Sequence, residues 1–264
     1  MHKIFLLMTA CITFCAPQIL ASTDKKAVVL YAKPANTSEA MIKNHLINLG
    51  LIDEIVVYIN EEYLLPQTLT FKIGARDGPL YDPISNEIFI PYFFIKEAKN
   101  RFSDAHYSET RVSVDDATWD ALMHTLLHEL AHALIAIYNL PVVGKEEDAA
   151  DSLATILLIE FFNEGTEIAI SAADLFYLES EDIVGSEEDY WDEHSLDIQR
   201  FYSTICLVYG SSPEKYIDLV NDMNFSEKRL TLCIDEYQNL LDNWIVLLKP
   251  HLKPMSRARM FEAE

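Results

Sequence analysis

Glycine and long apolar runs are both scarce in this 264-residue chain, and each scarcity narrows the fold. Only 7 residues are glycine, so few turns can use the left-handed backbone that glycine favours, which points to helix. Beyond the N-terminus no stretch has about 18 uninterrupted apolar residues, the length that a membrane-spanning helix needs. We therefore expect no stable membrane span. Hydrophobic residues make up 50% of the chain, enough for one sizeable core.

Positive charge is also in short supply. The chain has 20 Lys and Arg against 42 Asp and Glu, which gives a formal net charge of -22. A surface this acidic repels phosphate backbones and anionic headgroups. The balance excludes nucleic acid as a partner and otherwise indicates only a well-solvated protein.

The N-terminus has the features of an export signal. A short basic start precedes the apolar run Ile4–Phe14, and Ala16–Ser22 ends in small residues. This order is typical of a secretory signal peptide, predicted at residues 1–21. Lipidation at Cys11 stays an alternative, although the residues before it form a poor lipidation box. We expect a periplasmic or secreted protein whose mature part, residues 22–264, is a single domain.

Cysteine usage agrees with export. Of the four cysteines, Cys11 and Cys15 fall in the predicted signal, and Cys206 and Cys233 remain. An even pair in an oxidising compartment predicts a disulfide, worth roughly 3–4 kcal/mol of stability on the chain-entropy model. The alternative is a pair of buried free thiols.

The first third of the mature chain is predicted to form a small sheet. Short apolar runs, partly β-branched, predict strands at 27–32, 55–59, 69–73 and 88–92. Apolar residues at helical spacing predict a helix at 38–49, with Ser38 as its cap. Pro91 lies within the last run and favours an edge position for that strand.

From about residue 116 the pattern changes to helix. Apolar residues recur every three or four positions as far as Ile137, with Asp115 or Asp116 as cap and Pro141 as terminator. Further helices are predicted at 145–162, 192–208, 213–221 and 227–249, and the acidic stretch 179–192 as a solvated loop. The fold class is therefore α+β: a small N-terminal β-sheet followed by a mainly helical bundle.

The sharpest chemical signal is the run His128-Glu129-Leu130-Ala131-His132, an H-E-x-x-H pattern. Two histidines four residues apart share one helix face, so both imidazoles can bind the same Zn²⁺. Glu129 beside them can take a proton from a metal-bound water as general base. The alternative is a pair of structural histidines with an incidental glutamate, which the amphipathic helical setting disfavours.

The third metal ligand must come from elsewhere. His124 lies eight residues before His132, about 12 Å along the helix axis, whereas ligand atoms on one zinc are only ~3–3.5 Å apart. The loop to the next helix is short, so the two helices should be antiparallel neighbours. Glu147 can then complete the site, with Asp148 or Asp151 as alternatives, and Asp151 can instead orient a histidine. Acids in a first helical turn are also favoured without any metal.

His194 is a further candidate for the reaction. A donor side chain near the metal can stabilise the oxyanion of a tetrahedral intermediate. Asp192 or Asp197 could orient it. The alternative is a structural histidine at the start of a helix.

These motifs carry a family resemblance. HELAH followed by EDAAD resembles the gluzincin pattern H-E-x-x-H then E-x-x-x-D. The resemblance implies a zincin-like fold, zinc ligands at His128, His132 and Glu147, Glu129 as base, and Asp151 behind a histidine. The chain is also similar to a family of exported bacterial metallopeptidase-like proteins of unknown substrate, through Tyr-Asp-Pro at 81–83 and the segment 192–202.

Two hypotheses for function follow. The first is a zinc-dependent peptidase that hydrolyses an unidentified peptide or protein outside the cytoplasm, with the substrate extended along an edge strand at Ile88–Tyr92. The second is a non-catalytic zinc-containing binding or regulatory protein on a peptidase scaffold. The complete H-E-x-x-H favours the first, because a site that only holds metal has no use for Glu129. An intramembrane protease is disfavoured because several membrane spans are missing.

Overall fold

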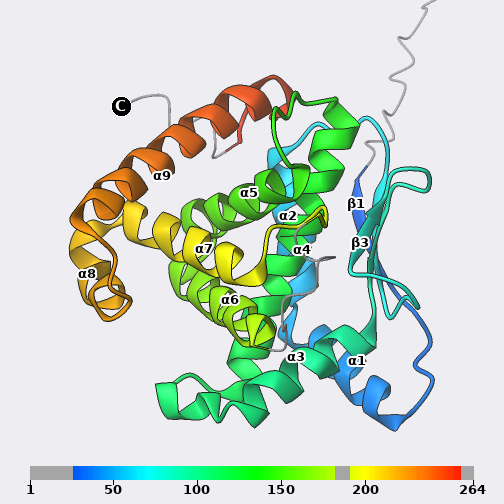
Figure 1. Cartoon of the computed structure of the whole chain (residues 1–264). Helices are drawn as coiled ribbons and strands as arrows, with labels where there is room; N and C mark the ends of the chain where they lie inside the picture. Colours follow the sequence, from blue (N-terminus) through cyan, green and yellow to red (C-terminus); the bar gives the residue numbers. More distant parts are fainter. Residues whose placement is uncertain (1–25, 182–190, 257–264) are drawn as a thin grey trace, which may run out of the picture.

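The computed structural model describes residues 26–181 and 191–256. The predicted signal peptide, Cys11, Cys15 and most of the acidic stretch lie outside the described residues. Within them the chain is α+β, with a small sheet near the N-terminus and helices over the rest (Figure 1). This class agrees with the prediction.

The sheet has four strands in the order β1-β2-β4-β3. The first three in that order are parallel neighbours, and β3 runs antiparallel to β4, with Tyr81 opposite Ile88. β3 is therefore an edge strand, and it lies against α4. The bounds of the strands are β1 Ala27–Tyr31, β2 Leu69–Ile73, β3 Leu80–Asp82 and β4 Glu87–Ile90.

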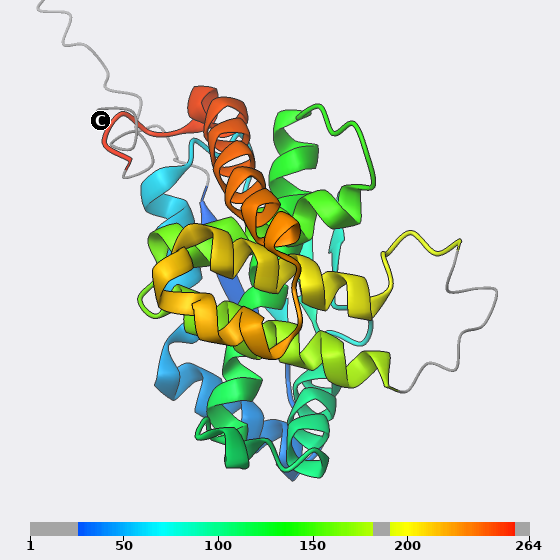
Figure 2. The same ribbon diagram turned by 60° about the vertical axis from the view of Figure 1, so that its left-hand side comes forward.

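The helices surround a central one, α4. It contacts the sheet through β3 and β4 and contacts α3, α5 and α6 on its other sides. Figure 2 brings forward α7, α8 and α9, which form the layer farthest from the sheet. The α-helices are α1 Thr37–Leu49, α2 Leu51–Glu62, α3 Tyr92–Asp104, α4 Val114–Tyr138, α5 Glu146–Phe161, α6 Gly165–Ser180, α7 Asp197–Ser211, α8 Pro213–Asp222 and α9 Glu227–Leu248.

Local sequence fixes both ends of α4. The Ser113 side chain accepts a hydrogen bond from the Asp116 backbone N–H, so Ser113 is the cap and the prediction of Asp115 or Asp116 was wrong. Asn139 ends the helix in the left-handed conformation. Among the described residues α4 alone is long and apolar enough to cross a membrane, but 72% of its most apolar window is buried in the protein. That is the pattern of a core helix.

The sheet region contains the main errors of the sequence prediction. The expected strand at 55–59 is part of α2, which buries Ile52, Ile55 and Ile59 at helical spacing. The strand predicted at Ile88–Tyr92 is β4, but it lies between β2 and β3 rather than at an edge. Pro91 follows it as the cap of α3, a helix that was not predicted. A proline in that position breaks no strand pairing.

Two smaller predictions also needed correction. The cap of α1 is Asn36 rather than Ser38, because the Asn36 side chain accepts from the Glu39 N–H. The helix expected from residue 192 begins only at Asp197. The strands at 27–32 and 69–73 and the helices α5, α8 and α9 were predicted to within a few residues. The sequence analysis predicted neither α6 nor β3.

The C-terminal helices are joined covalently. Cys206 of α7 and Cys233 of α9 form a disulfide, as predicted. Both residues are fully buried. The bond holds α9 against α7, and α5 packs against both.

Candidate metal centre

α4 brings two histidine nitrogens together. His128 and His132 lie one turn apart, and their Nε2 atoms are 3.2 Å from each other. His128 is buried, with 6% of its surface exposed. Two nitrogens bound to one tetrahedral zinc at the usual bond length lie ~3.3 Å apart. The pair therefore has the spacing that a shared metal ion requires.

α5 supplies the third donor. Glu147 Oε2 lies 3.1 Å from His128 Nε2 and 3.3 Å from His132 Nε2. Together with the histidine pair, it forms a nearly equilateral triangle of two nitrogens and one oxygen, the donor types that zinc accepts. Of the three carboxylates considered from the sequence, Glu147 is the one in this position. These residues fit a divalent metal ion.

An ion pair between Asp151 and Arg200 supports the His128 ring on its Nδ1 side. Asp151 Oδ1 lies 2.7 Å from His128 Nδ1, which leaves Nε2 for the donor triangle. Arg200 of α7 donates to both Asp151 oxygens, at 2.7 and 2.9 Å, and its guanidinium lies over the Phe176 ring. Burial alone would raise the Asp151 pKa, but Arg200 and His128 outweigh it and lower the pKa. Asp151 thus stays ionised and fixes the imidazole orientation.

His194, in the loop before α7, lies close to the Glu147 carboxylate of the donor triangle. Its Nε2 lies 3.0 Å from Glu147 Oε2 and its Nδ1 3.1 Å from Asp192 Oδ1. His128, Glu147 and His194 form a second set of three donor atoms, all within 4.8 Å of one another. The two sets share His128 and Glu147, so His194 lies beside the donor triangle.

Polar contacts from α5 hold this loop in place. Lys145 Nζ donates to the backbone carbonyls of Asp192 and His194, at 3.1 and 2.9 Å. Ser195 Oγ donates to Asp148 Oδ1 at 2.6 Å. Asp148 therefore anchors the loop and does not join the donor triangle.

Glu129 lies next to the histidine pair and contacts the edge strand. It is buried, with 5% exposed. Burial raises its pKa, while the neighbouring histidines and a hydrogen bond from the Tyr81 backbone N–H oppose that rise. A carboxylate with a raised pKa is suited to accept and return a proton near neutral pH. Tyr81 belongs to the Tyr-Asp-Pro element noted in the sequence.

His124 is separate from the metal centre, as its place on the helix predicted. It is buried, its Nε2 lies 3.4 Å from Thr155 Oγ1, and its ring meets the edge of Phe176. Burial lowers its pKa to about 4. His124 is a neutral core residue.

The carboxylates around the donor triangle favour protonation of its histidines. Burial disfavours protonation of His132, but hydrogen bonds to Glu147 and Glu146 outweigh it and raise its pKa to about 9. Burial would raise the Glu147 pKa, but hydrogen bonds from the three histidines lower it. A metal ion must therefore displace histidine protons to bind.

Two contributors escaped the sequence reasoning. Arg200 stood in the segment that carried the family resemblance, but nothing local linked it to Asp151, which is 49 residues earlier. Glu146 Oε1 lies 2.9 Å from His132 Nδ1 and supports that ring as Asp151 supports His128. Its position one residue before Glu147 was the only available signal.

Comparison with known proteins places the chain in a family. No curated protein and no solved structure matches it. A family model described as "Putative metallopeptidase" matches residues 31–248, which include every residue of the donor triangle and its supports. The chain belongs to this metallopeptidase family.

Proposed function

We propose that the protein is a zinc-dependent peptidase of the gluzincin type, with a zincin-like fold. The observation that carries the proposal is the triangle of His128 Nε2, His132 Nε2 and Glu147 Oε2, with edges of 3.1–3.3 Å. Two nitrogens and one carboxylate oxygen leave a tetrahedral zinc one open position, as catalytic zinc sites require. When bound there, zinc would polarise the scissile carbonyl and acidify the attacking water.

The other residues have roles that follow from their positions. Glu129 would take the proton of the attacking water and pass it to the leaving amine. His194 would donate to the oxyanion of the tetrahedral intermediate, with Asp192 fixing its ring. Asp151 and Arg200 would keep His128 in the tautomer that presents Nε2.

The substrate would lie along β3 rather than along β4. Since β4 has partners on both sides, it offers no free edge. The described strands leave one side of β3 unpaired, and the Tyr81 N–H reaches Glu129. An extended peptide added there by backbone pairing would pass beside the proposed base.

The test is Glu129→Gln in the purified mature protein. We expect metal content to stay at the wild-type level while peptide hydrolysis falls by at least about a hundredfold, the usual contribution of a general base. Zinc is measured by mass spectrometry and hydrolysis with a peptide library. Undiminished turnover in the Gln variant would falsify the assignment of the base.

One observation favours a second candidate, a non-catalytic zinc-containing binding or regulatory protein. His194 Nε2 is as close to Glu147 Oε2 as the other two histidines are. If His194 bound the metal as a fourth side chain, the centre would be closed, as structural zinc sites are. Full zinc content without cleavage of any library member would favour this candidate. A His194→Ala variant that gains activity would show the closed state directly.

The proposed location is outside the cytoplasm. The disulfide between Cys206 and Cys233 is compatible with export, because such bonds persist in oxidising compartments. The signal peptide at residues 1–21 remains part of the proposal. N-terminal sequencing of the protein recovered from culture medium or periplasm tests it.

A further inference from the structure

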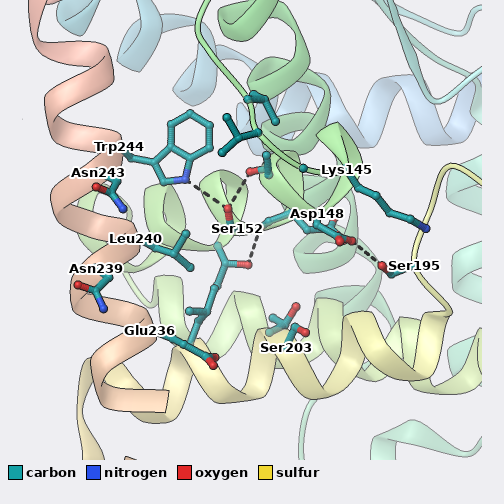
Figure 3. Close-up of a pocket in the computed structure, with 18 of the residues that line it drawn as sticks. Lys145, Asp148, Ser152, Ser195, Ser203, Glu236, Asn239, Leu240, Asn243 and Trp244 are labelled. Atoms are coloured by element: carbon teal, nitrogen blue, oxygen red, sulfur yellow. Dashed lines mark hydrogen bonds between the residues drawn. The ribbon is translucent and has the colours of Figure 1, made fainter. Parts of the chain in front are cut away.

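A cavity of about 960 Å³ lies beside the metal centre, between α5, α7, α9 and the loop 141–145 (Figure 3). Asp151 and Arg200, which brace His128, form part of its wall. The donor triangle and His194 do not line it. The volume is at the upper end of the range for ligand pockets. The cavity is therefore a separate space that shares one wall with the metal centre.

Two rows of neutral polar side chains line this space from opposite helices. Gln199 and Ser203 lie four residues apart on α7, and Asn239 and Asn243 lie four apart on α9, so each pair shares a helix face. Figure 3 shows Asn239 and Asn243 along α9 with Ser203 on α7. Within the described part of the chain, the side chains of Ser203, Asn239 and Asn243 have no hydrogen-bond partner. All three residues are exposed to solvent, so a ligand would replace water at these side chains.

Each charged group around the cavity already has a hydrogen-bond or ion-pair partner. Asp148 accepts from Ser195, and Glu236 pairs with Arg229. Lys145 is bound to two backbone carbonyls, and Arg200 to Asp151. The groups left free to form hydrogen bonds are thus the neutral ones, which favours an uncharged ligand.

The remaining lining is apolar. Leu207, Leu240, Leu247 and Val142 contribute aliphatic surface. Trp244 is 6% exposed, and its Nε1 donates to Ser152 Oγ at 3.2 Å, so the indole is fixed in the wall. A buried indole offers no flat face for a sugar ring to stack on. Aliphatic surface beside the row of carboxamides on α9 suits a polypeptide, because each carboxamide can both donate to a main-chain carbonyl and accept from a main-chain N–H.

We propose that this cavity is a second binding site, which takes an uncharged segment of a polypeptide substrate away from the bond being cleaved. The carboxamides of Asn239 and Asn243 pair with the main chain of the segment, and the aliphatic wall receives its apolar side chains. The identification of the polypeptide as substrate rests on the proposed peptidase function. The existence of a binding site is argued only from the residues that line the cavity, independently of that function.

The binding test uses the zinc-loaded mature protein carrying Glu129→Gln, so that peptides are not consumed. The probe is a fluorescently labelled pool of random uncharged dodecapeptides, and a matched pool has Glu at every third position. Binding is followed by fluorescence anisotropy. We expect the neutral pool to bind and the Glu pool to bind about tenfold more weakly, because Lys145 and Arg200 are already engaged and a carboxylate would meet no free cation in the cavity.

Variants within the cavity locate the binding. Replacing both Asn239 and Asn243 by Ala removes about two neutral hydrogen bonds and should weaken binding about tenfold. Ser203→Trp fills the space and should abolish binding. Gln238→Ala is the matched control, because Gln238 is an exposed carboxamide on α9 that does not line the cavity. Zinc content and the melting temperature identify any variant that has lost its fold.

The outcomes separate this proposal from the peptidase proposal. No peptide binding, binding that ignores the Asn pair and Ser203→Trp, or preferential binding of an oligosaccharide such as chitohexaose would each overturn the cavity assignment. Peptide binding that depends on the Asn pair supports it, even if the wild type cleaves nothing. Glu129-dependent cleavage without that binding would retain the peptidase and reject the second site.

Discussion

The metal centre and the cavity lie on two sides of α5, and their polar groups differ in charge and in how they are held. The side towards α4 carries Glu147 and Asp151, both nearly buried, ionised and held by several partners. The side towards α9 borders the cavity, where neutral carboxamides from a neighbouring helix have no partner in the described chain. Buried charges need fixed partners, and fixed partners give the geometry that metal chemistry requires. Neutral side chains that are exposed to solvent, such as these carboxamides, can stay without a protein partner at little cost in free energy.

Removing a metal ligand should have the largest effect, a loss of zinc affinity at the metal centre. His128→Ala and Glu147→Ala each delete one donor of the triangle, so we expect zinc affinity to fall by at least about a thousandfold, beyond the loss typical of a supporting residue. Zinc titration with a competing chelator measures it. His106→Asn is the control, because His106 is exposed and Asn tolerates its positive φ. Unchanged zinc affinity in both Ala variants would refute the donor assignment.

Removing the disulfide should lower global stability and weaken peptide binding without changing zinc content. Replacing Cys206 and Cys233 by Ser opens a link across 27 residues and should lower the free energy of unfolding by roughly 3–4 kcal/mol. Because the bond joins α7 to α9, peptide binding should weaken while zinc content stays at the wild-type level. Urea unfolding and zinc analysis measure the two effects. Loss of zinc together with peptide binding would show that the two sides are not independent.

A substitution at Asp151 tests the residue that supports His128 and also lines the cavity. Asp151→Asn keeps the shape but leaves Arg200 without its charge partner and weakens the hold on His128. We expect zinc affinity to drop about 10–100-fold, as for other residues that orient a ligand histidine. Asp148→Asn is the matched control on the same helix, since Asp148 bonds to Ser195 in the loop before α7 and lies outside the donor triangle. Equal losses in both variants would argue against a special role for Asp151.

The last prediction concerns pH dependence and needs no substitution. Without metal, His132 has a pKa raised to about 9, so below that pH a proton must leave before zinc binds. Zinc affinity should therefore rise about tenfold per pH unit from pH 7 towards 9 and then level off. The free groups of the cavity are neutral, so peptide binding should change little over the same range. Isothermal titration at three pH values distinguishes the two profiles.

The sequence was informative where function depends on neighbours along one or two helices. The four-residue spacing of His128 and His132, and of Glu147 and Asp151, follows from helical periodicity. The short connection from Asn139 to Lys145 then brings the two helices together. The sequence could therefore place the two histidines and a carboxylate of the next helix, but it left Glu147, Asp148 and Asp151 as alternatives for the third donor.

The sequence prediction failed where contacts between segments far apart in the chain determine the structure. β-Branched residues at 55–59 favoured a strand, but their spacing let α2 bury Ile52, Ile55 and Ile59 against the core, and packing outweighed propensity. Pro91 was assigned to a strand that had already ended. Arg200 reaches Asp151 only because α7 packs on α5, and no local pattern encodes that contact. The cavity likewise depends on three helices meeting.

The position of the donors in the chain has a consequence for how the protein acquires its metal. His128 and Glu147 are only 19 residues apart and belong to one helical hairpin. Local hairpins form early and quickly in folding, whereas the parallel strands and the link between α7 and α9 require long-range closure. If the hairpin folds first, it can bind a cation before the disulfide and the sheet form. Binding at that stage would stabilise α4 and α5 as the surface on which the rest of the chain folds.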